Sequence, residues 1–562
     1  MTRSLVSISL LLALVALGAC APSEDVVPSG SAGSSAMGSA GTTGTAGTTG
    51  TAGTTGDAGT TGTSGTTGAA ASGGSGGSGG STGSAGSIAG TGGGAAGATG
   101  GSTAGRGGTG GSTGGGAATG GSSAGRGGAG GSSAGRGGSG GGTAGVTGGG
   151  GAGGCTITAT STMGTIPTVG IVTFTTNASG LTSAEIRFGL ASTGPTMTAP
   201  VDLAQANYRT LLLGMKGSSS YVYRIVASSS AGTCTSQDYT IMTGAVPSSV
   251  PKPTTTISMA AAHSKGFIVT SSGISGTGAY IFDSDGAPVW WATGPSGTSR
   301  IQMSWDGSKM YMMALNVQNN GAGRVNTVNM DGSGATMISG MTTSHHDMTA
   351  IPGGFATLLW NATGIDAPCS LVERADSGTM TTVVANMNTV YNSNSFHTNS
   401  VHYYPSDNTY TLGDRNPNLY VKVSRTGQLI WQLGGANPKD AAKQFSGAGT
   451  WSVNHGHHLL ADGTFVLFNN GSMMSGASTM RMFKLNTSNM TAMPGLTYTG
   501  SGVNSNVMGD AQVLPNGNIL VTASQSGQLT EITSGGQVVA TFKATAFGYS
   551  EYRDSLYGPP PR

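Results

Sequence analysis

Histidine residues are concentrated in one stretch of this chain. The sequence contains eight histidines, and seven of them lie between residues 345 and 458. His345 and His346 open one segment, His397 opens the next and His455 opens the one after, each just before an apolar run typical of a strand. Imidazoles donate or accept hydrogen bonds, bind metal ions or attack electrophiles. We therefore expect the chemistry of the protein to lie in this stretch.

Turn signals predict that other polar side chains come back to the same places. The strand after His397 is followed by a turn and by a return strand that ends near Arg415. His455 leads in the same way through an Asp-Gly turn to Asn469 and Asn470, and Asp-Gly between apolar runs is a strong hairpin signal. The predicted site is a cluster of imidazoles, one guanidinium and amides, with few carboxylates.

A cluster of this kind suits an anionic substrate. A guanidinium offers a planar fork of donors that matches sulfate or phosphate oxygens. Two other interpretations stay open, a zinc or copper site and histidines that only pack in a structural protein. The arginine argues against a metal ion, although the spacing of His455 and His457 keeps that option. The recurrence of histidine at the start of successive segments argues against packing alone.

Residues 260–548 must supply the strands that position these side chains. Strand, tight turn and strand alternate there, with turns such as Asp285-Gly286, Asp462-Gly463 and Asn516-Gly517. Larger units recur roughly every 50 residues, which in an all-β chain indicates the blades of a propeller. We expect an all-β fold with six blades, whose inner strands bring equivalent positions to one mouth of a central channel. A two-sheet sandwich is the alternative, and residues 549–562 are expected to form a tail.

Residues 155–245 predict a separate, smaller β domain. Runs such as Val169–Thr176 and Tyr221–Ala227 alternate apolar and polar residues. The pattern resembles the late strands of a fibronectin type III sandwich. Cys155 and Cys234 bracket this domain, and we expect them to form a disulfide, which would leave Cys369 unpaired.

Residues 21–154 consist almost entirely of Gly, Ser, Thr and Ala. Such a segment cannot bury enough apolar surface to offset its conformational entropy, so we expect a disordered tether. A glycine-rich tail that binds nucleic acid is the weaker alternative, because aromatic residues are absent here. A net charge of +2 and the lack of a basic stripe also predict no nucleic-acid partner.

Residues 1–20 are typical of an export signal. Arg3 precedes an apolar run from Leu5 to Leu17 that is too short to span a bilayer. The run ends in Leu17-Gly18-Ala19-Cys20, which resembles a bacterial lipobox with Cys20 as the lipidated residue. An ordinary secretory signal is the alternative. The expectation is a lipid-anchored protein of the outer membrane, because Ala21 rather than an acidic residue follows the cysteine.

The region from about 260 to 545 resembles the bacterial arylsulfate sulfotransferase family. The resemblance rests on four pieces, which are His345-His346-Asp347 before Pro-Gly-Gly, His397-Thr-Asn399 with Arg415 after it, Leu429-Ile-Trp431-Gln-Leu-Gly434-Gly435, and His455 before Phe468-Asn469-Asn470-Gly471. It implies a six-bladed propeller that needs no nucleotide cofactor. It also implies ping-pong transfer of a sulfuryl group from an aryl sulfate to a phenol through a sulfated histidine.

By position, the resemblance makes His455 the nucleophile and His397 and Arg415 the pair that holds the sulfuryl oxygens. His346, or its neighbour His345, matches the third imidazole. We further expect His345, Asn399, Asn469 and Asn470 to line the substrate site, and we expect no metal. One departure is Asn469, which replaces the acid usual in the family. A non-enzymatic surface propeller that binds a carbohydrate or a protein is therefore the alternative function.

Overall fold

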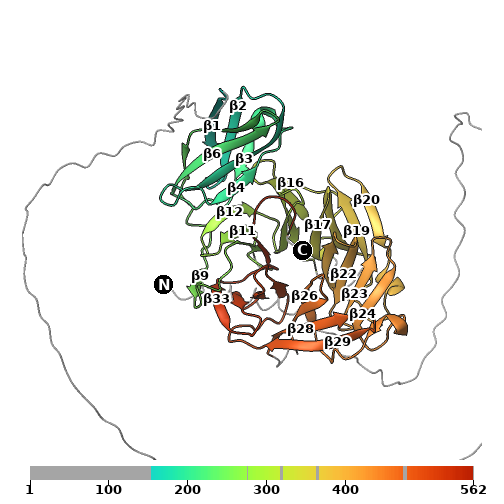
Figure 1. The fold of residues 1–562 in the computed structure, drawn as a ribbon. Helices are drawn as coiled ribbons and strands as arrows, with labels where there is room; N and C mark the ends of the chain where they lie inside the picture. The colour runs from blue at the N-terminus through green and yellow to red at the C-terminus, as the bar shows by residue number, and fades with distance from the viewer. Residues whose placement is uncertain (1–153, 275, 317–319, 363–365, 472–476, 561–562) are drawn as a thin grey trace, which may run out of the picture. The chain divides into compact units, whose positions relative to one another are not determined.

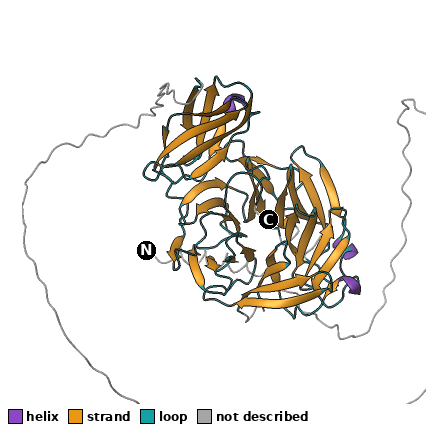
Figure 2. Cartoon of the chain, viewed as in Figure 1, coloured by secondary structure: helices purple, strands orange, loops and turns teal. Residues whose placement is uncertain are grey.

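The computed structural model describes residues 154–560, except 275, 317–319, 363–365 and 472–476. The predicted signal peptide with Cys20 and the glycine-rich segment up to residue 153 lie outside the described residues. The described part contains strands and only three short 3-10 turns, η2 (Ala206–Tyr208), η3 (Met387–Thr389) and η4 (Ala441–Lys443) (Figure 2). None of its helical segments has the length and apolar character that a membrane crossing needs. The predicted all-β class is confirmed.

The strands near the start of the described chain form two sheets. They are β1 (Ile157–Met163), β2 (Gly170–Thr176), β3 (Leu181–Leu190), β4 (Met197–Pro200), β5 (Thr210–Leu212), β6 (Ser220–Ser229), β7 (Gly232–Thr235) and β8 (Tyr239–Met242). One sheet has the order β1-β2-β5, and the other has the order β4-β3-β6-β7 with β8 paired to β6. Alternating side chains such as Val172, Ile186 and Ile225 fill one shared core. Cys155 and Cys234 form the expected disulfide.

The remaining strands form six sheets around a common centre (Figure 1). The first three contain β10 (Phe267–Ser271), β11 (Gly278–Asp283) and β12 (Pro288–Thr293); β13 (Thr298–Met303), β14 (Lys309–Ala314), β15 (Val325–Asn329) and β16 (Thr336–Met337); and β17 (Ser344–Ile351), β18 (Gly354–Trp360), β19 (Cys369–Ala375) and β20 (Met380–Val384).

The next three sheets continue the same pattern along the chain. They contain β21 (Thr398–Tyr404), β22 (Thr409–Asp414), β23 (Leu419–Ser424), β24 (Leu429–Gly434) and β25 (Gln444–Phe445); β26 (Asn454–Leu459), β27 (Thr464–Asn469), β28 (Thr479–Asn486) and β29 (Thr491–Tyr498); and β30 (Asp510–Val513), β31 (Ile519–Ala523), β32 (Gln528–Ile532) and β33 (Val538–Lys543). Apart from the parallel pair of β24 and β25, neighbouring strands are antiparallel. A ring of such sheets is typical of a β-propeller.

The ring is closed by strands from both ends of this region. β34 (Glu551–Arg553) pairs with β10 and completes the first sheet, and β9 (Thr254–Ile257) pairs with β33 and completes the last one. The expected limits of 260 and 548 were therefore too narrow, and residues 549–562 are not merely a tail. Both strands are short and polar, so neither has the alternating apolar pattern that identifies a strand from sequence.

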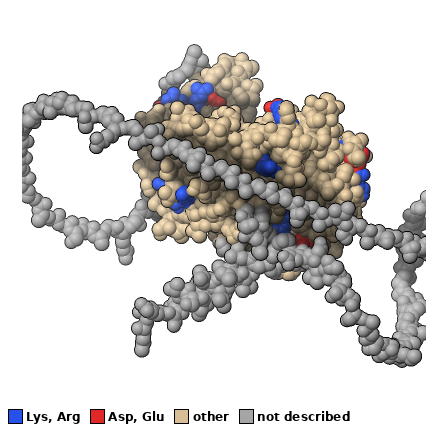
Figure 3. Space-filling model, turned by 90° about the horizontal axis from the view of Figure 1, so that it is seen from below, with Lys and Arg blue, Asp and Glu red and all other residues tan. Residues whose placement is uncertain are grey.

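The first strands of successive sheets lie side by side at the centre, as the contacts of β13 with β17, of β17 with β21, and of β21 with β26 show. Apolar side chains fill the spaces between neighbouring sheets, for example Leu358 and Val401 between the third and fourth. Burying such a side chain contributes about 2–3 kcal/mol. On the face seen in Figure 3, lysine and arginine side chains are scattered rather than gathered in a stripe.

Four of these central strands carry a β-bulge close to their start. The register shifts between Thr298 and Arg300 in β13, between His345 and Met348 in β17, between Thr398 and Ser400 in β21, and between Asn454 and His457 in β26. A bulge inserts an unpaired residue and redirects its side chain. The bulged residues include His346, Asn399 and His455. We call this end of the central strands the channel mouth.

Candidate active site

Three histidines and one carboxylate form a continuous chain of contacts at the channel mouth. The Nε2 atoms of His346 and His397 are 3.0 Å apart. His346 Nδ1 lies 2.9 Å from Nδ1 of His345, and His397 Nδ1 lies 2.7 Å from Oδ1 of Asp366. All three imidazoles are buried. The structure therefore brings together side chains that are far apart in the sequence.

The carboxylate sets the direction of the hydrogen bonds in this chain. Burial opposes the charge of Asp366, but the hydrogen bond from His397 lowers its pKa, so the carboxylate accepts. Burial and the charge of Arg415 lower the pKa of His397 to about 4, so its imidazole is neutral at neutral pH. His397 then donates from Nδ1 and accepts at Nε2, and His346 donates from Nε2.

His455 is held by a different partner. Its Nδ1 lies 2.7 Å from Oδ1 of Asn470. The amide nitrogen of Asn470 donates to the carbonyl oxygens of Ser505 at 2.6 Å and Met508 at 2.7 Å, which fixes the amide orientation. Asn470 Oδ1 is thus an acceptor, and His455 carries its proton on Nδ1. The lone pair of the neutral ring is on Nε2, which is the nitrogen able to act as a nucleophile.

The charge of Arg415 acts on all three site histidines. Burial and this guanidinium together lower the pKa of His455 to about 3. Burial first, and then the charges of its neighbours including Arg415, lower the pKa of His346 well below its usual value. His346 and His455 are thus both affected by the charges of His397 and Arg415.

Asp414 positions two of these residues together. Its carboxylate accepts hydrogen bonds from the backbone amide of His397 at 2.9 and 3.0 Å and from the hydroxyl of Tyr391 at 2.5 Å. The backbone amide of Arg415 donates to the carbonyl oxygen of His397 at 3.3 Å. The end of β22 is thereby fixed against the start of β21, as the hairpin predicted.

The predicted amide residues divide into two groups. Asn399 lies in the bulge of β21, donates from Nδ2 to the carbonyl oxygen of Asn454 at 2.7 Å, and has a buried Oδ1 with no hydrogen-bond partner among the described residues. Asn469 is different, because its Oδ1 accepts from the backbone of Ser452 and its Nδ2 donates to Thr479. Both ends of the Asn469 amide thus have partners within the fold, and its place among the substrate-lining residues stays a prediction.

His345 lies behind His346 rather than beside His397. Its ring stacks on Trp360 with centroids 3.9 Å apart, its Nδ1 contacts His346, and its Nε2 has no hydrogen-bond partner among the described residues. Of the two candidates for the third imidazole, the structure places His346 next to His397. The alternative of a metal site finds no support in the described residues, among which no group of three or more His, Cys, Asp or Glu side chains is arranged to hold an ion.

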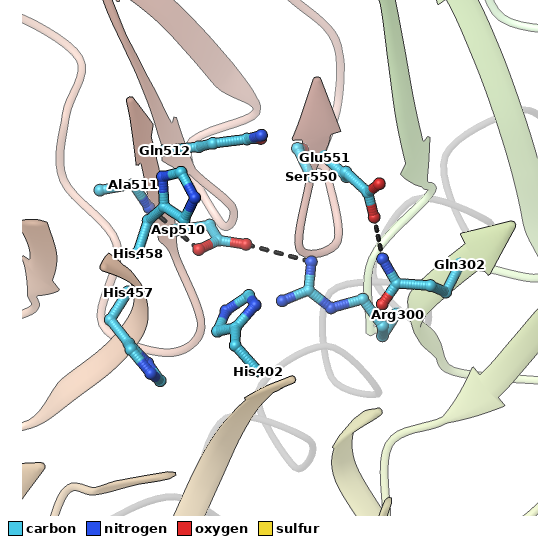
Figure 4. Close-up of a pocket in the computed structure, with 10 residues that line it drawn as sticks. All are labelled: Arg300, Gln302, His402, His457, His458, Asp510, Ala511, Gln512, Ser550 and Glu551. Atoms are coloured by element: carbon cyan, nitrogen blue, oxygen red, sulfur yellow. Dashed lines mark hydrogen bonds and ion pairs between the residues drawn. The ribbon is translucent and has the colours of Figure 1, made fainter. Parts of the chain in front are cut away.

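Some residues near the site were not identified from the sequence. Asp366 comes from the loop after β18, and no motif marks it. Below the mouth, a small cavity is lined by residues of several central strands, namely Arg300, Gln302, His402, His457, His458, Asp510, Ala511, Gln512, Ser550 and Glu551 (Figure 4). We call this cavity the channel interior.

Several solved structures resemble the chain at low sequence identity. The periplasmic gluconolactonase of Pseudomonas aeruginosa is 14% identical, with a TM-score of 0.35 over 51% of this chain and 98% of that one. TolB of Acinetobacter baumannii is 10% identical, with a TM-score of 0.35 over 61% and 80%. A virginiamycin B lyase of Staphylococcus aureus is 10% identical, with a TM-score of 0.32 over 52% and 89%. Scores of this size carry no inference about function.

No curated protein sequence matches the chain. The comparison with family models is more informative, because residues 365–545 match the model described as arylsulfotransferase (ASST). The matched segment contains His397, Arg415, His455 and Asn470, and it includes the two hairpins that the structure brings to the channel mouth. In this segment, the chain is similar to the arylsulfotransferase family.

Proposed function

We propose that this protein is a nucleotide-independent sulfotransferase that moves a sulfuryl group from an aryl sulfate to a phenol through a sulfated histidine. One observation carries the proposal. Asn470 fixes the tautomer of His455 so that the lone pair of its neutral ring is on Nε2, and the charge of Arg415 acts on His455, His397 and His346. A nucleophile and donors for a tetrahedral anion are thus combined in one buried site.

The reaction follows from this arrangement. Nε2 of His455 attacks the sulfur in line, a nitrogen–sulfur bond forms, and the sulfur–oxygen bond to the aryl group breaks to release a phenolate. Asn470 accepts a hydrogen bond from Nδ1 of His455 throughout, and so stabilises the positive charge that develops on the ring. The oxygen of a second phenol then attacks the sulfur and gives its proton to solvent, the nitrogen–sulfur bond breaks, and neutral His455 is regenerated.

The oxygens of the sulfuryl group need donors while their charge is redistributed. Arg415 supplies a permanent cation. His346 has an Nε2–H that now points to His397 and can turn to a bound oxygen. An anion beside His397 favours the imidazolium and so raises the pKa of that ring, which makes His397 a second donor when substrate is bound.

The acid that is replaced by Asn469 is not needed to orient the nucleophile. Asn470 holds the imidazole, and Asn469 is occupied by the turn at Ser452 and by Thr479. These contacts favour an enzyme over a non-enzymatic propeller that only binds a carbohydrate or a protein. We also propose that the six sheets are the six blades of the family fold and that the small domain is fibronectin III-like. Export and anchoring in the outer membrane through Cys20 complete the proposal.

The test is a transfer assay with the purified full chain. Release of phenol from a chromogenic aryl sulfate should accelerate when a phenolic acceptor is added. After incubation with the donor alone, mass spectrometry should find a peptide that contains His455 and carries an added sulfuryl group. A chain that binds aryl sulfates yet forms no adduct and releases no phenol would be a binding protein, and the proposal would be abandoned.

A further inference from the structure

A single buried arginine lies beneath the channel mouth and contacts three other residues. Arg300 of β13 is only 2% exposed. Its Nε lies 2.6 Å from Oδ1 of Asp347, and its Nη1 lies 3.1 Å from Oδ2 of Asp510. Figure 4 shows the ion pair with Asp510. The guanidinium carbon lies 4.5 Å from the centre of the Tyr549 ring. Each of these three contacts leads to one of the bulges at the mouth.

The first contact leads to His346. Asp347 directly follows His346 within the bulge of β17. Its carboxylate also accepts from the backbone amides of Met348 at 2.8 Å and of Val401 at 3.0 Å. The ion pair with Arg300 therefore fixes the bulge of β17 against the neighbouring strand β21.

The second contact leads to His455. Asp510 packs against Gly456, the residue after His455, so closely that a Cβ there would lie 2.1 Å from Oδ1 of Asp510. The amide of Gly456 donates to the carbonyl oxygen of Gly509 at 3.0 Å. Arg300 holds the carboxylate of Asp510 in place, and this carboxylate leaves room only for a glycine at position 456.

The third contact leads to Asn399. The hydroxyl of Tyr549 donates to the carbonyl oxygen of Asn399 at 3.0 Å. The same ring lies 6.5 Å, between centroids, from the ring of His455. Tyr549 is therefore placed between Arg300 on one side and the channel mouth on the other.

We propose that Arg300 is the positioning residue that holds the bulges of His346, Asn399 and His455 in the one arrangement that transfer requires. This inference rests on the proposed function. Arg300 and Tyr549 both lie outside the segment that matches the family model. Buried ion pairs contribute little net stability because desolvation offsets the attraction. The two ion pairs and the cation–π contact of Arg300 therefore point to a role in positioning rather than in stability. A displacement of about 1 Å at a reacting group can cost roughly 100-fold in rate.

The experiment compares Arg300→Lys with Arg553→Lys in the full chain. Arg553 is an equally buried arginine of β34 that pairs with Glu551, so the control matches the loss of a buried guanidinium. We expect Arg300→Lys to lower kcat roughly 100-fold with KM changed less than about threefold, since the pocket remains but its parts are misaligned. We expect Arg553→Lys to change neither by more than about threefold. Wild-type kcat in Arg300→Lys, or equal losses in both variants, would overturn the inference.

A second variant, Tyr549→Phe, and a second measurement, the spectra of labelled histidines, test the positioning role of Arg300 independently. Tyr549→Phe removes only the hydroxyl that holds Asn399, and we expect kcat to fall about tenfold. In spectra of the full chain with ¹³C-labelled histidine, Arg300→Lys should shift the signals of His346 and His455 but not that of His263. This readout does not need turnover, so it tests positioning even if the wild type transfers no sulfuryl group. Unchanged signals for both mouth histidines would refute the inference whatever the activity.

Discussion

Two histidines of β26 show how the channel mouth differs from the channel interior. His455 at the mouth has Nδ1 fixed by the amide oxygen of Asn470, which leaves a lone pair on Nε2. His457, two residues further on, has Nδ1 3.0 Å from the hydroxyl of Ser400 and Nε2 2.6 Å from that of Thr411. Both of its nitrogens are occupied by partners within the fold. The same residue type on one strand thus has one ring nitrogen held by a side-chain amide in one place and both held by hydroxyls in the other.

The bulge explains why neighbours on one strand differ so much. In a regular strand, residues 455 and 457 would point to the same face. The register shift between Asn454 and His457 breaks this alternation and turns His455 toward the mouth. The backbone just before it has a positive φ of 56° at Val453, and His346 has a positive φ of 57°. Such conformations are uncommon for non-glycine residues and concentrate at functional sites.

The largest expected effect separates these two histidines directly. His455→Ala should abolish phenol release and the sulfuryl adduct, because no other nitrogen can attack. His457→Gln should lower the melting temperature but keep kcat per folded molecule within about threefold, because it removes hydrogen bonds worth about 1 kcal/mol each. Initial rates and thermal unfolding of both proteins provide the measurement. Equal losses of kcat in His455→Ala and His457→Gln would contradict the proposed difference between the channel mouth and the channel interior.

The next effect concerns the cation of the mouth. Arg415→Ala should cost at least about 2 kcal/mol of transition-state stabilisation, because a preorganised donor to developing charge is lost. The measurement is kcat/KM for a chromogenic aryl sulfate. Arg425→Ala is the control, since Arg425 pairs with Glu373 on the outside of the sheet. If both variants kept wild-type kcat/KM, Arg415 would have no part in the reaction.

A smaller effect should distinguish two adjacent asparagines. Asn470→Ala removes the acceptor that fixes the proton on Nδ1 of His455, and we expect kcat to fall about tenfold to 100-fold, as for other partners that orient a functional imidazole. Asn469→Ala should stay within about threefold, because Asn469 bonds to Ser452 and Thr479. The opposite order of losses, measured as kcat at saturating donor, would show that Asn469 orients the nucleophile.

The smallest effect involves the histidine outside the cluster. His263 contacts Glu531 through Nδ1 and lies 2.8 Å from the carbonyl oxygen of Ser284 through Nε2, which requires protons on both nitrogens. Burial opposes its charge, but these partners raise its pKa above 6.5, and they lower the pKa of Glu531 below 4.5 despite burial. The ion pair of His263 and Glu531 therefore contributes its full stabilisation between pH 4.5 and pH 6.5, the ordinary pKa values of the two groups.

This contribution should be lost as the pH rises through the raised pKa of His263, and also as it falls through the lowered pKa of Glu531. The wild type should exceed His263→Gln in unfolding free energy by about 1–3 kcal/mol near pH 5.5, and the difference should shrink above neutral pH. Denaturant titrations at several pH values measure it. A difference that does not change with pH would mean that His263 is neutral in the folded state.

The sequence predicted those parts of the molecule that local patterns encode. The turn at Asp462-Gly463 formed as expected, with φ of 85° at the glycine, because this tight turn needs a positive φ. The hairpins brought Arg415 to His397 and Asn470 to His455 for the same reason. The bulges could not be predicted, because an extra residue in a strand leaves no compositional signal. Asp366, Arg300 and Tyr549 reach the site only through the tertiary fold.

The first sheet of the ring can be completed only after β34, the last strand of this region, has been synthesised. The first sheet lacks its central strand until residues 551–553 have been synthesised, and until then β10 has an unpaired edge that can associate with other chains. A chain cut after residue 548 would expose that edge permanently and would also lack Tyr549. We therefore expect such a truncation to aggregate, because the short polar segment that completes the first sheet would be missing.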